Sequence, residues 1–237
     1  MPMPGTVMTT AEPRSGSSLY RLLAWLSPGF PTGGFSYSHG LEAAVAGGAV
    51  RDRDGLAAWV AAVVAHGGGK IDGDVLCSAY RAAAAGDLEA LGLANRRGMA
   101  FRATAELSTE SAQQGEAFLA ACRAAWPDAL LECWAGDDGV CHSAAFGAAA
   151  ARAGIALENA LLGYLEAFAA NLVSAGLRLG LIGHTGAQRI IAELEPTICA
   201  AARAAIGRDP DDFGAATFAI DLASMAHETQ YSRLFRS

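Results

Sequence analysis

The chain has 237 residues, of which 52% are apolar and 54 are alanine, and its formal net charge is −7. This is enough apolar material for one sizeable core. The 17 Lys and Arg residues form no polybasic run, which argues against nucleic acid as a partner. Alanine is the strongest helix former and a poor strand former, so the composition favours packed helices.

The start of the chain and its cysteines indicate a cytoplasmic protein. Residues 1–18 lack the basic start and apolar stretch of a secretory signal, and we expect a flexible tail there. Five cysteines at irregular spacing favour reduced thiols over a disulfide framework. The apolar segment 160–183 contains Glu166, Asn171 and Arg178, which predicts a buried helix rather than a membrane span.

Helical spacing dominates the rest of the chain, and no segment shows the alternation of a half-buried strand. We predict an all-α fold, with one domain of about eight to ten helices over residues 19–237. The first clear helix is expected from Asp54, as its N-cap, to the glycines at 67–69. Further helices are expected at roughly 72–85, 87–105, 107–126, 142–153, 157–179, 185–206 and 211–234, the one at 157–179 being central.

Two patterns that are typical of enzymes are incomplete. Residues 67–70 read Gly-Gly-Gly-Lys, but a phosphate-binding loop needs glycine where Val64 stands and a hydroxyl where Ile71 stands. His227 begins half of a zinc-protease motif, but Tyr231 occupies the place of the second histidine. We therefore interpret residues 67–70 as a glycine cluster that ends a helix. The motif at His227 does not support a mononuclear zinc hydrolase.

A third possibility is a metal cluster formed by Cys133, Cys141 and His142. Their spacing matches no common metal site. Buried structural thiols and a histidine at a helix start are therefore the favoured interpretation.

The segment from Ser27 to Glu42 makes unusual demands on the backbone. It holds two prolines, four glycines and three aromatic residues within sixteen positions. This content predicts a rigid, specifically turned loop that enters a helix at about Ser36. The alternative is a plain connection that packs its aromatic rings into the core.

The segment 224–237 does not give way to small polar residues toward the last residue of the sequence. Aromatic and arginine residues alternate in it, and these are the types enriched at interface hot spots. Terminal segments usually fray unless something binds them. We therefore expect an interface tail that orders against a partner, the alternative being a solvated helix end.

These two segments, with three internal ones, resemble the UreF family of urease accessory proteins, which are components of a nickel-insertion chaperone. The similar segments are 26–42, 101–107 with Gly115, 172–179, 183–189 and 227–237. The resemblance extends from about Leu19 to the end. Two positions depart from the family pattern: Ala226 stands where a basic residue is frequent, and His184 where glutamine is common.

The resemblance implies an all-helical, cytoplasmic, non-enzymatic protein. Such a protein joins the scaffold protein UreD, called UreH in some organisms, and the GTPase UreG to activate apo-urease. It implies a homodimer, with nickel as the delivered metal and no stably bound cofactor, and neither nucleic acid nor a membrane as a partner. The expected partner-binding residues are Pro31, Gly34, Ser36, Tyr37, His39, Glu42, Arg178, Gln188, Arg189, His227, Glu228, Tyr231, Arg233, Phe235 and Arg236.

By matching position, Tyr37 and Glu42 are expected near the surface presented to the GTPase, where alanine substitutions leave the core intact. The tail from His227 to Ser237 is expected to become ordered at the scaffold-protein interface.

Two other functions stay open. The protein could regulate or stimulate the GTPase by offering an arginine to the phosphoryl-transfer transition state, the candidates being Arg178, Arg189, Arg233 and Arg236. It could also bind nickel itself through His227 or through the adjacent Cys141 and His142. Structural roles are commoner for arginine and histidine on helices, which makes both alternatives secondary.

Overall fold

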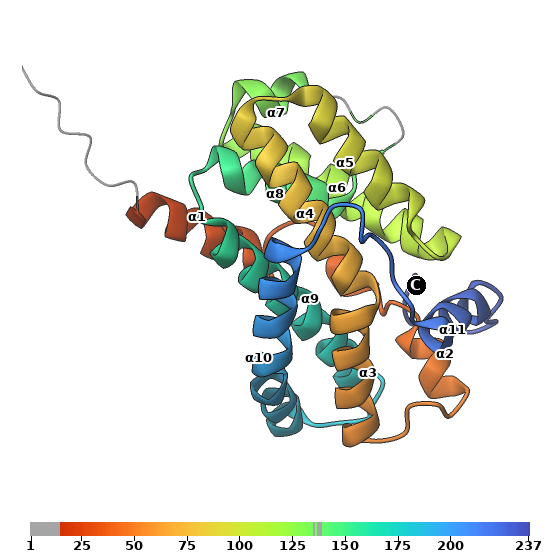
Figure 1. Cartoon of the computed structure of the whole chain (residues 1–237). Helices are drawn as coiled ribbons and strands as arrows, with labels where there is room; N and C mark the ends of the chain where they lie inside the picture. The colour runs from red at the N-terminus through yellow and green to blue at the C-terminus, as the bar shows by residue number, and fades with distance from the viewer. Residues whose placement is uncertain (1–14, 135, 137–138) are drawn as a thin grey trace, which may run out of the picture.

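The computed structural model describes residues 15–134, 136 and 139–237, which form an all-α fold without a β-strand (Figure 1). This confirms the predicted fold class. The helices are α1 (Ser15–Leu26), α2 (Leu41–Ala46), α3 (Arg53–His66), α4 (Gly68–Ala85), α5 (Leu88–Ala100), α6 (Ala105–Ala125), α7 (Ala129–Cys133), α8 (His142–Arg152), α9 (Leu157–Arg178), α10 (His184–Gly207) and α11 (Phe218–Glu228), with a 3-10 helix η1 at Gly34–Ser36.

Helices α4 and α8 pack closely at the centre of the molecule. Every residue from Ser143 to Ala150 in α8 is buried, and most of them are alanine. Gly147 faces the backbone of α4, where a Cβ atom would lie only 2.5 Å from the carbonyl oxygen of Leu76. Since a close-packed interior has no spare room at this crossing, only glycine fits at position 147. The small side chains of the alanine-rich α8 therefore allow α4 and α8 to approach each other closely.

Helix α9 spans Leu157–Arg178, as the leucine spacing predicts. Leu161, Leu165 and Leu172 are buried in the core on one face of it. Within the described residues it is the only helix long and apolar enough to cross a membrane, and half of its most apolar window is buried inside the fold. The buried core helix of a soluble protein has the same properties, as the sequence predicted for residues 160–183.

Several predicted boundaries are wrong, for local reasons. Asp52, not Asp54, caps α3, because its carboxylate accepts a hydrogen bond from the Gly55 N–H at 2.8 Å. Gly67 ends α3, but α4 begins at once, so the glycine cluster separates two consecutive helices. The predicted helix at 211–234 is reduced to Phe218–Glu228.

Two further boundaries differ near the start of the chain. Residues 15–18 of the predicted tail at 1–18 begin α1 instead, and residues 1–14 lie outside the described part of the chain. The loop predicted to enter a helix at about Ser36 instead forms η1, and α2 begins only at Leu41. The delay follows from the left-handed conformations of His39 and Gly40, with φ of 56° and 78°, which a right-handed helix does not accept.

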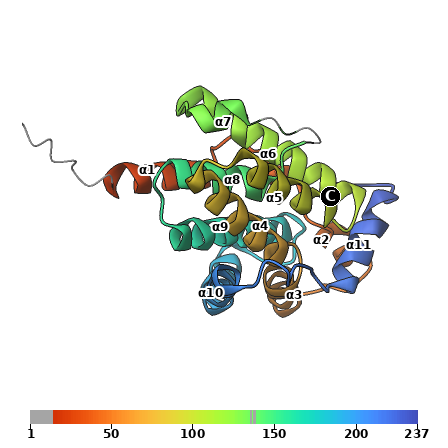
Figure 2. The same cartoon turned by 45° about the horizontal axis from the view of Figure 1, so that its top comes forward.

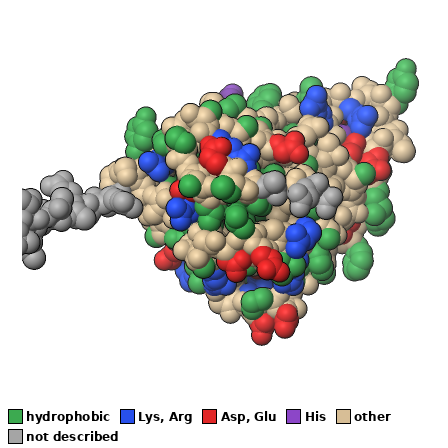
Figure 3. Space-filling model, turned by 90° about the horizontal axis from the view of Figure 1, so that it is seen from above, with side chains coloured by type: hydrophobic (Ala, Val, Ile, Leu, Met, Phe, Trp, Pro, Cys, Tyr) green, Lys and Arg blue, Asp and Glu red, His purple; other side chains and the backbone are tan. Residues whose placement is uncertain are grey.

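The two ends of the fold lie far apart. Helix α1 projects from one end, while α11 and the C-terminal residues lie at the opposite end in both views (Figures 1 and 2). Helix α11 packs against α2 and α6 there. The face drawn in Figure 3 mixes acidic and basic side chains, without a continuous basic surface. The mixed charges on this face are consistent with the sequence-based argument against nucleic acid as a partner.

Candidate functional site

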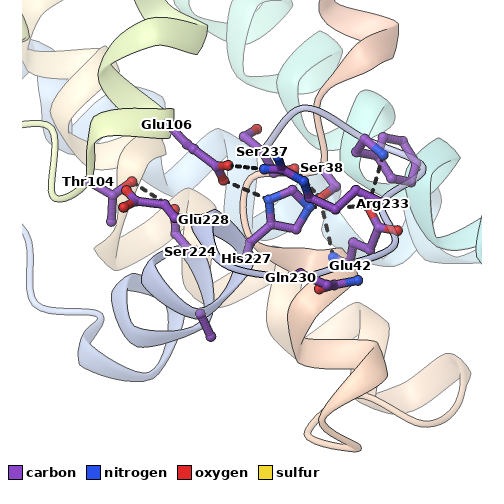
Figure 4. A network of polar contacts seen from close by, with 12 residues as sticks. Ser38, Glu42, Thr104, Glu106, Ser224, His227, Glu228, Gln230, Arg233 and Ser237 are labelled. Carbon is purple, nitrogen blue, oxygen red and sulfur yellow. Dashed lines mark hydrogen bonds and ion pairs between the residues drawn. The ribbon is translucent and has the colours of Figure 1, made fainter.

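The carboxylate of Glu42 joins the N-terminal loop to the C-terminal segment (Figure 4). Its Oε1 atom accepts a hydrogen bond from the Leu234 N–H at 2.7 Å, and its Oε2 atom accepts one from the Phe235 N–H at 2.9 Å. Glu42 lies in the first turn of α2, where the helix dipole favours a negative charge. A carboxylate from the loop segment thereby fixes the backbone of the tail.

His227 lies between two carboxylates in the same cluster. Its Nε2 atom is 3.2 Å from Glu42 Oε2, and its Nδ1 atom is 2.6 Å from Glu106 Oε2. The side chain is fully buried, and Glu106 also accepts a hydrogen bond from Arg233 at 2.7 Å. Both ring nitrogens of His227 are thereby engaged by carboxylates within the chain, and the histidine connects α11 to α2 and α6.

The last residues of the chain pair with the loop through their backbone. The Ser38 N–H donates to the Ser237 carbonyl oxygen at 2.9 Å, and the Arg236 N–H donates to the Ser36 carbonyl oxygen at 2.8 Å. The Ser237 hydroxyl donates to Glu110 of α6 at 2.7 Å. The tail is therefore ordered within a single chain, whereas the sequence predicted that a partner would order it.

Tyr37 and Glu42 are both buried, with exposed fractions of 3% and 6%. The Tyr37 hydroxyl donates to Gln113 of α6 at 2.5 Å. The expectation that they can be replaced without disturbing the core is wrong. Each side chain reaches inward to a partner on α6 or in the tail, so truncation removes that hydrogen bond and leaves a gap where the buried side chain was.

His39 occupies a strained backbone position next to this cluster. It is the one residue other than glycine with a positive φ in the described part of the chain. Its Nδ1 atom lies 3.5 Å from Glu110 Oε2, and its ring meets Phe168 edge to face. Position 40 needs glycine, since a Cβ there would stand 2.9 Å from the Ser224 backbone nitrogen. Such strain persists only where surrounding contacts hold it, and α6 and α9 supply them through Glu110 and Phe168.

Arg178 connects loop and tail from the side of α9. Its guanidinium lies 3.7 Å from the ring centroid of Phe35 and 4.3 Å from that of Phe235, and it donates to the Phe35 carbonyl oxygen. Burial lowers the pKa of this group from its ordinary value. The cation thus holds one ring from each segment through cation–π contacts.

The same cluster presents apolar groups to solvent. Tyr231 is fully exposed, and Phe35 and Leu234 are exposed by 66% and 63%. Phe218, Leu222 and Met225 form an exposed stripe along the adjoining α11. We call Phe35, Tyr231 and Leu234, with the α11 stripe, the tail surface. Single exposed apolar residues are ordinary, but a group on a rigid base is typical of a protein-binding site.

The remaining predicted residues are distributed unevenly. Glu228 is exposed and accepts a hydrogen bond from the Ala105 N–H of α6 at 3.2 Å. Pro31 and Gly34 line a pocket next to the loop. Gln188 and Arg189 are exposed on α10, and within the described residues no hydrogen bond or ion pair joins their side chains to the loop or the tail.

Residues of α6 complete the site, and the sequence interpretation assigned them no role. Glu106 contacts His227 and Arg233, and Glu110 accepts a hydrogen bond from Ser237. The two carboxylates stand four residues apart and so share one face of the helix, which is the signal that could have identified them.

A second polar cluster is buried behind the loop. Arg102 donates to Asp72 at 2.6 Å and to the Cys141 thiol at 3.0 Å, and the Tyr164 hydroxyl donates to Asp72 at 3.2 Å. Burial opposes ionisation of both charged groups, but each raises the other's charged fraction, so the pKa of Asp72 lies below its ordinary value. Burial lowers the pKa of His142 to about 4 and leaves it neutral at pH 7.

No group of three or more His, Cys, Asp or Glu side chains suited to a metal ion occurs in the part of the chain that the structure describes. Cys133 is exposed, whereas Cys141 is buried. The structure therefore does not bring together Cys133, Cys141 and His142 as a metal cluster.

The structure defines an all-α protein in which a loop and the C-terminal segment form one bonded cluster that carries exposed apolar side chains. A family model described as UreF matches residues 50–195. The urease accessory protein UreF of Granulibacter bethesdensis is 46% identical over 223 residues, covering 93% of this chain and 94% of that protein. The protein of the same name from Azorhizobium caulinodans is 46% identical over 232 residues, covering 97% and 100%. The chain belongs to the UreF family of urease accessory proteins, which confirms the resemblance.

Proposed function

We propose that this protein is a non-enzymatic, cytoplasmic component of the complex that inserts nickel into apo-urease. Its partners are the scaffold protein UreD or UreH, the GTPase UreG and apo-urease, and it works as a homodimer. Nickel is the cargo of this assembly rather than a resident cofactor. The names of the relatives, which are urease accessory proteins, support the role in urease maturation.

The tail surface is the observation that carries the proposal. Its exposed rings and aliphatic groups lie on a base fixed by Glu42, His227 and Arg178. A surface ordered before binding loses little conformational entropy when a partner docks. It is therefore suited to hold a partner rather than to perform chemistry.

Size-exclusion chromatography with purified UreD and UreG tests this function. We expect co-elution at micromolar concentrations, and Tyr231→Ala should weaken the complex by about tenfold or more, because an exposed aromatic anchor is lost. Leu93→Ala is the matched control, since Leu93 is exposed on α5 away from the tail surface. Failure of both partners to co-elute with the wild-type protein would refute the proposal.

Stimulation of the GTPase by a donated arginine receives less support from the geometry. Arg178 is held between two rings, and Arg233 is paired with Glu106. Arg189 and Arg236 are exposed and stay candidates. Turnover of UreG with and without the protein distinguishes the roles, because a scaffold leaves the rate of hydrolysis unchanged.

A further inference from the structure

A pocket of about 700 Å³ lies between the 27–35 loop and helices α6, α8 and α9. Its wall combines aromatic rings with a few polar groups, which is typical of ligand-binding cavities. The rings belong to Trp25, Phe30, Phe35, Phe146, Tyr164 and Phe168. Phe35 also belongs to the tail surface, so the pocket and the face where we place a partner share this side chain.

The charges of the pocket wall leave a negative excess. Asp72 and Arg102 neutralise each other at 2.6 Å, and both are buried. His142 is neutral at pH 7, since burial lowers its pKa to about 4. Glu110 and Glu166 remain as two further carboxylates in the wall.

Of these two, Glu166 has no counter-ion. Glu110 already accepts a hydrogen bond from Ser237 and faces His39. The Glu166 side chain is exposed at the pocket, and no hydrogen bond or ion pair reaches it within the residues described. The residues three and four positions away on α9 are Leu, Gly and Ala, so its own helix supplies no cation. Its apolar surroundings raise the pKa of its carboxyl group above the ordinary value.

We propose that this pocket receives one cationic side chain, an arginine or a lysine, from a partner protein that docks on the tail surface. Glu166 is the counter-ion, and the rings of Phe30 and Phe168 supply aromatic surface for the alkyl stem and the cation. The chain already uses this chemistry at the pocket rim, where Arg178 lies over Phe35 at 3.7 Å. Continuity with the tail surface favours a protein side chain over a free ion.

Calorimetric titration of the full chain with N-butylguanidinium tests the chemistry of the site. We expect saturable binding of N-butylguanidinium to the wild-type protein. The Kd should be about tenfold higher for the neutral analogue N-butylurea, and also about tenfold higher for N-butylguanidinium with Glu166→Gln. Glu195→Gln, an exposed change on α10 outside the pocket, should bind like the wild type. No saturable binding, or equal binding of the neutral analogue, would overturn the proposal.

A second titration separates a side chain from a free cation. The capped tripeptide Ser-Arg-Ser should bind in a Glu166-dependent way, and the capped Ser-Gln-Ser should not. If only N-butylguanidinium binds, the site accepts free cations and its assignment to a partner side chain is wrong. Neither titration contains a urease protein, so their failure leaves the proposed function standing.

Discussion

Glu42 accepts a hydrogen bond from the backbone N–H of Phe235, 193 residues further along the chain, at 2.9 Å. The same carboxylate holds the Leu234 N–H and faces His227. One buried side chain therefore binds two consecutive backbone N–H groups beneath the tail surface.

Replacement of Glu42 by glutamine should destabilise the protein by about 2–4 kcal/mol. An amide oxygen still accepts a hydrogen bond, but its NH₂ group cannot accept the second backbone N–H, and His227 faces one carboxylate fewer. Urea denaturation measures the loss. Glu89→Gln is the control, because Glu89 is an exposed carboxylate in the first turn of α5, and its change should stay within about 0.5 kcal/mol. Equal effects of the two substitutions would contradict the role of Glu42.

Replacement of Arg178 by lysine should loosen the tail while the charge is retained. A planar guanidinium stacks on the rings of Phe35 and Phe235, whereas a compact ammonium group does not, and about 1 kcal/mol of stabilisation is lost. Hydrogen exchange of the backbone at residues 231–237 should become faster. Arg189→Lys, on the exposed side of α10, should leave exchange unchanged, and unchanged exchange in Arg178→Lys as well would argue against the contact.

Replacement of Gly147 by alanine tests the close packing of α4 and α8. The added Cβ would stand 2.5 Å from the Leu76 carbonyl oxygen, so the helices must separate. We expect a loss of about 2 kcal/mol or more in the free energy of unfolding. Gly207→Ala, at the open end of α10 with no atom near the new Cβ, should be neutral or slightly stabilising. A tolerated Gly147→Ala would show that the crossing can relax.

The stability of the fold should fall between pH 6.5 and pH 4 through His142. Its pKa is about 4 in the fold against an ordinary value of 6.5, so the unfolded state binds the proton first as the pH falls. Its contribution is complete above pH 6.5, and at most about 3 kcal/mol is lost near pH 4. Urea denaturation across this range should give a shallower pH dependence for His142→Asn. An identical slope would show that His142 does not titrate as described.

The sequence by itself determined the fold class and the family. Small residues and helical periodicity gave the all-α fold and the core helix α9, because the spacing of apolar residues follows from local helix geometry. It also marked both terminal segments as unusual. Their residue types alone indicated contact with proteins.

Only the tertiary structure decided what these segments contact. The sequence suggested that Tyr37 and Glu42 face a partner, yet both point inward, because their hydrogen-bond partners come from α6 and from the far end of the chain. Pairings over such separations leave no periodic signal along the chain. The tail is therefore part of the folded core through His227, Phe235 and Ser237, while Tyr231 and Leu234 stay exposed and belong to the tail surface with Phe35 and the α11 stripe.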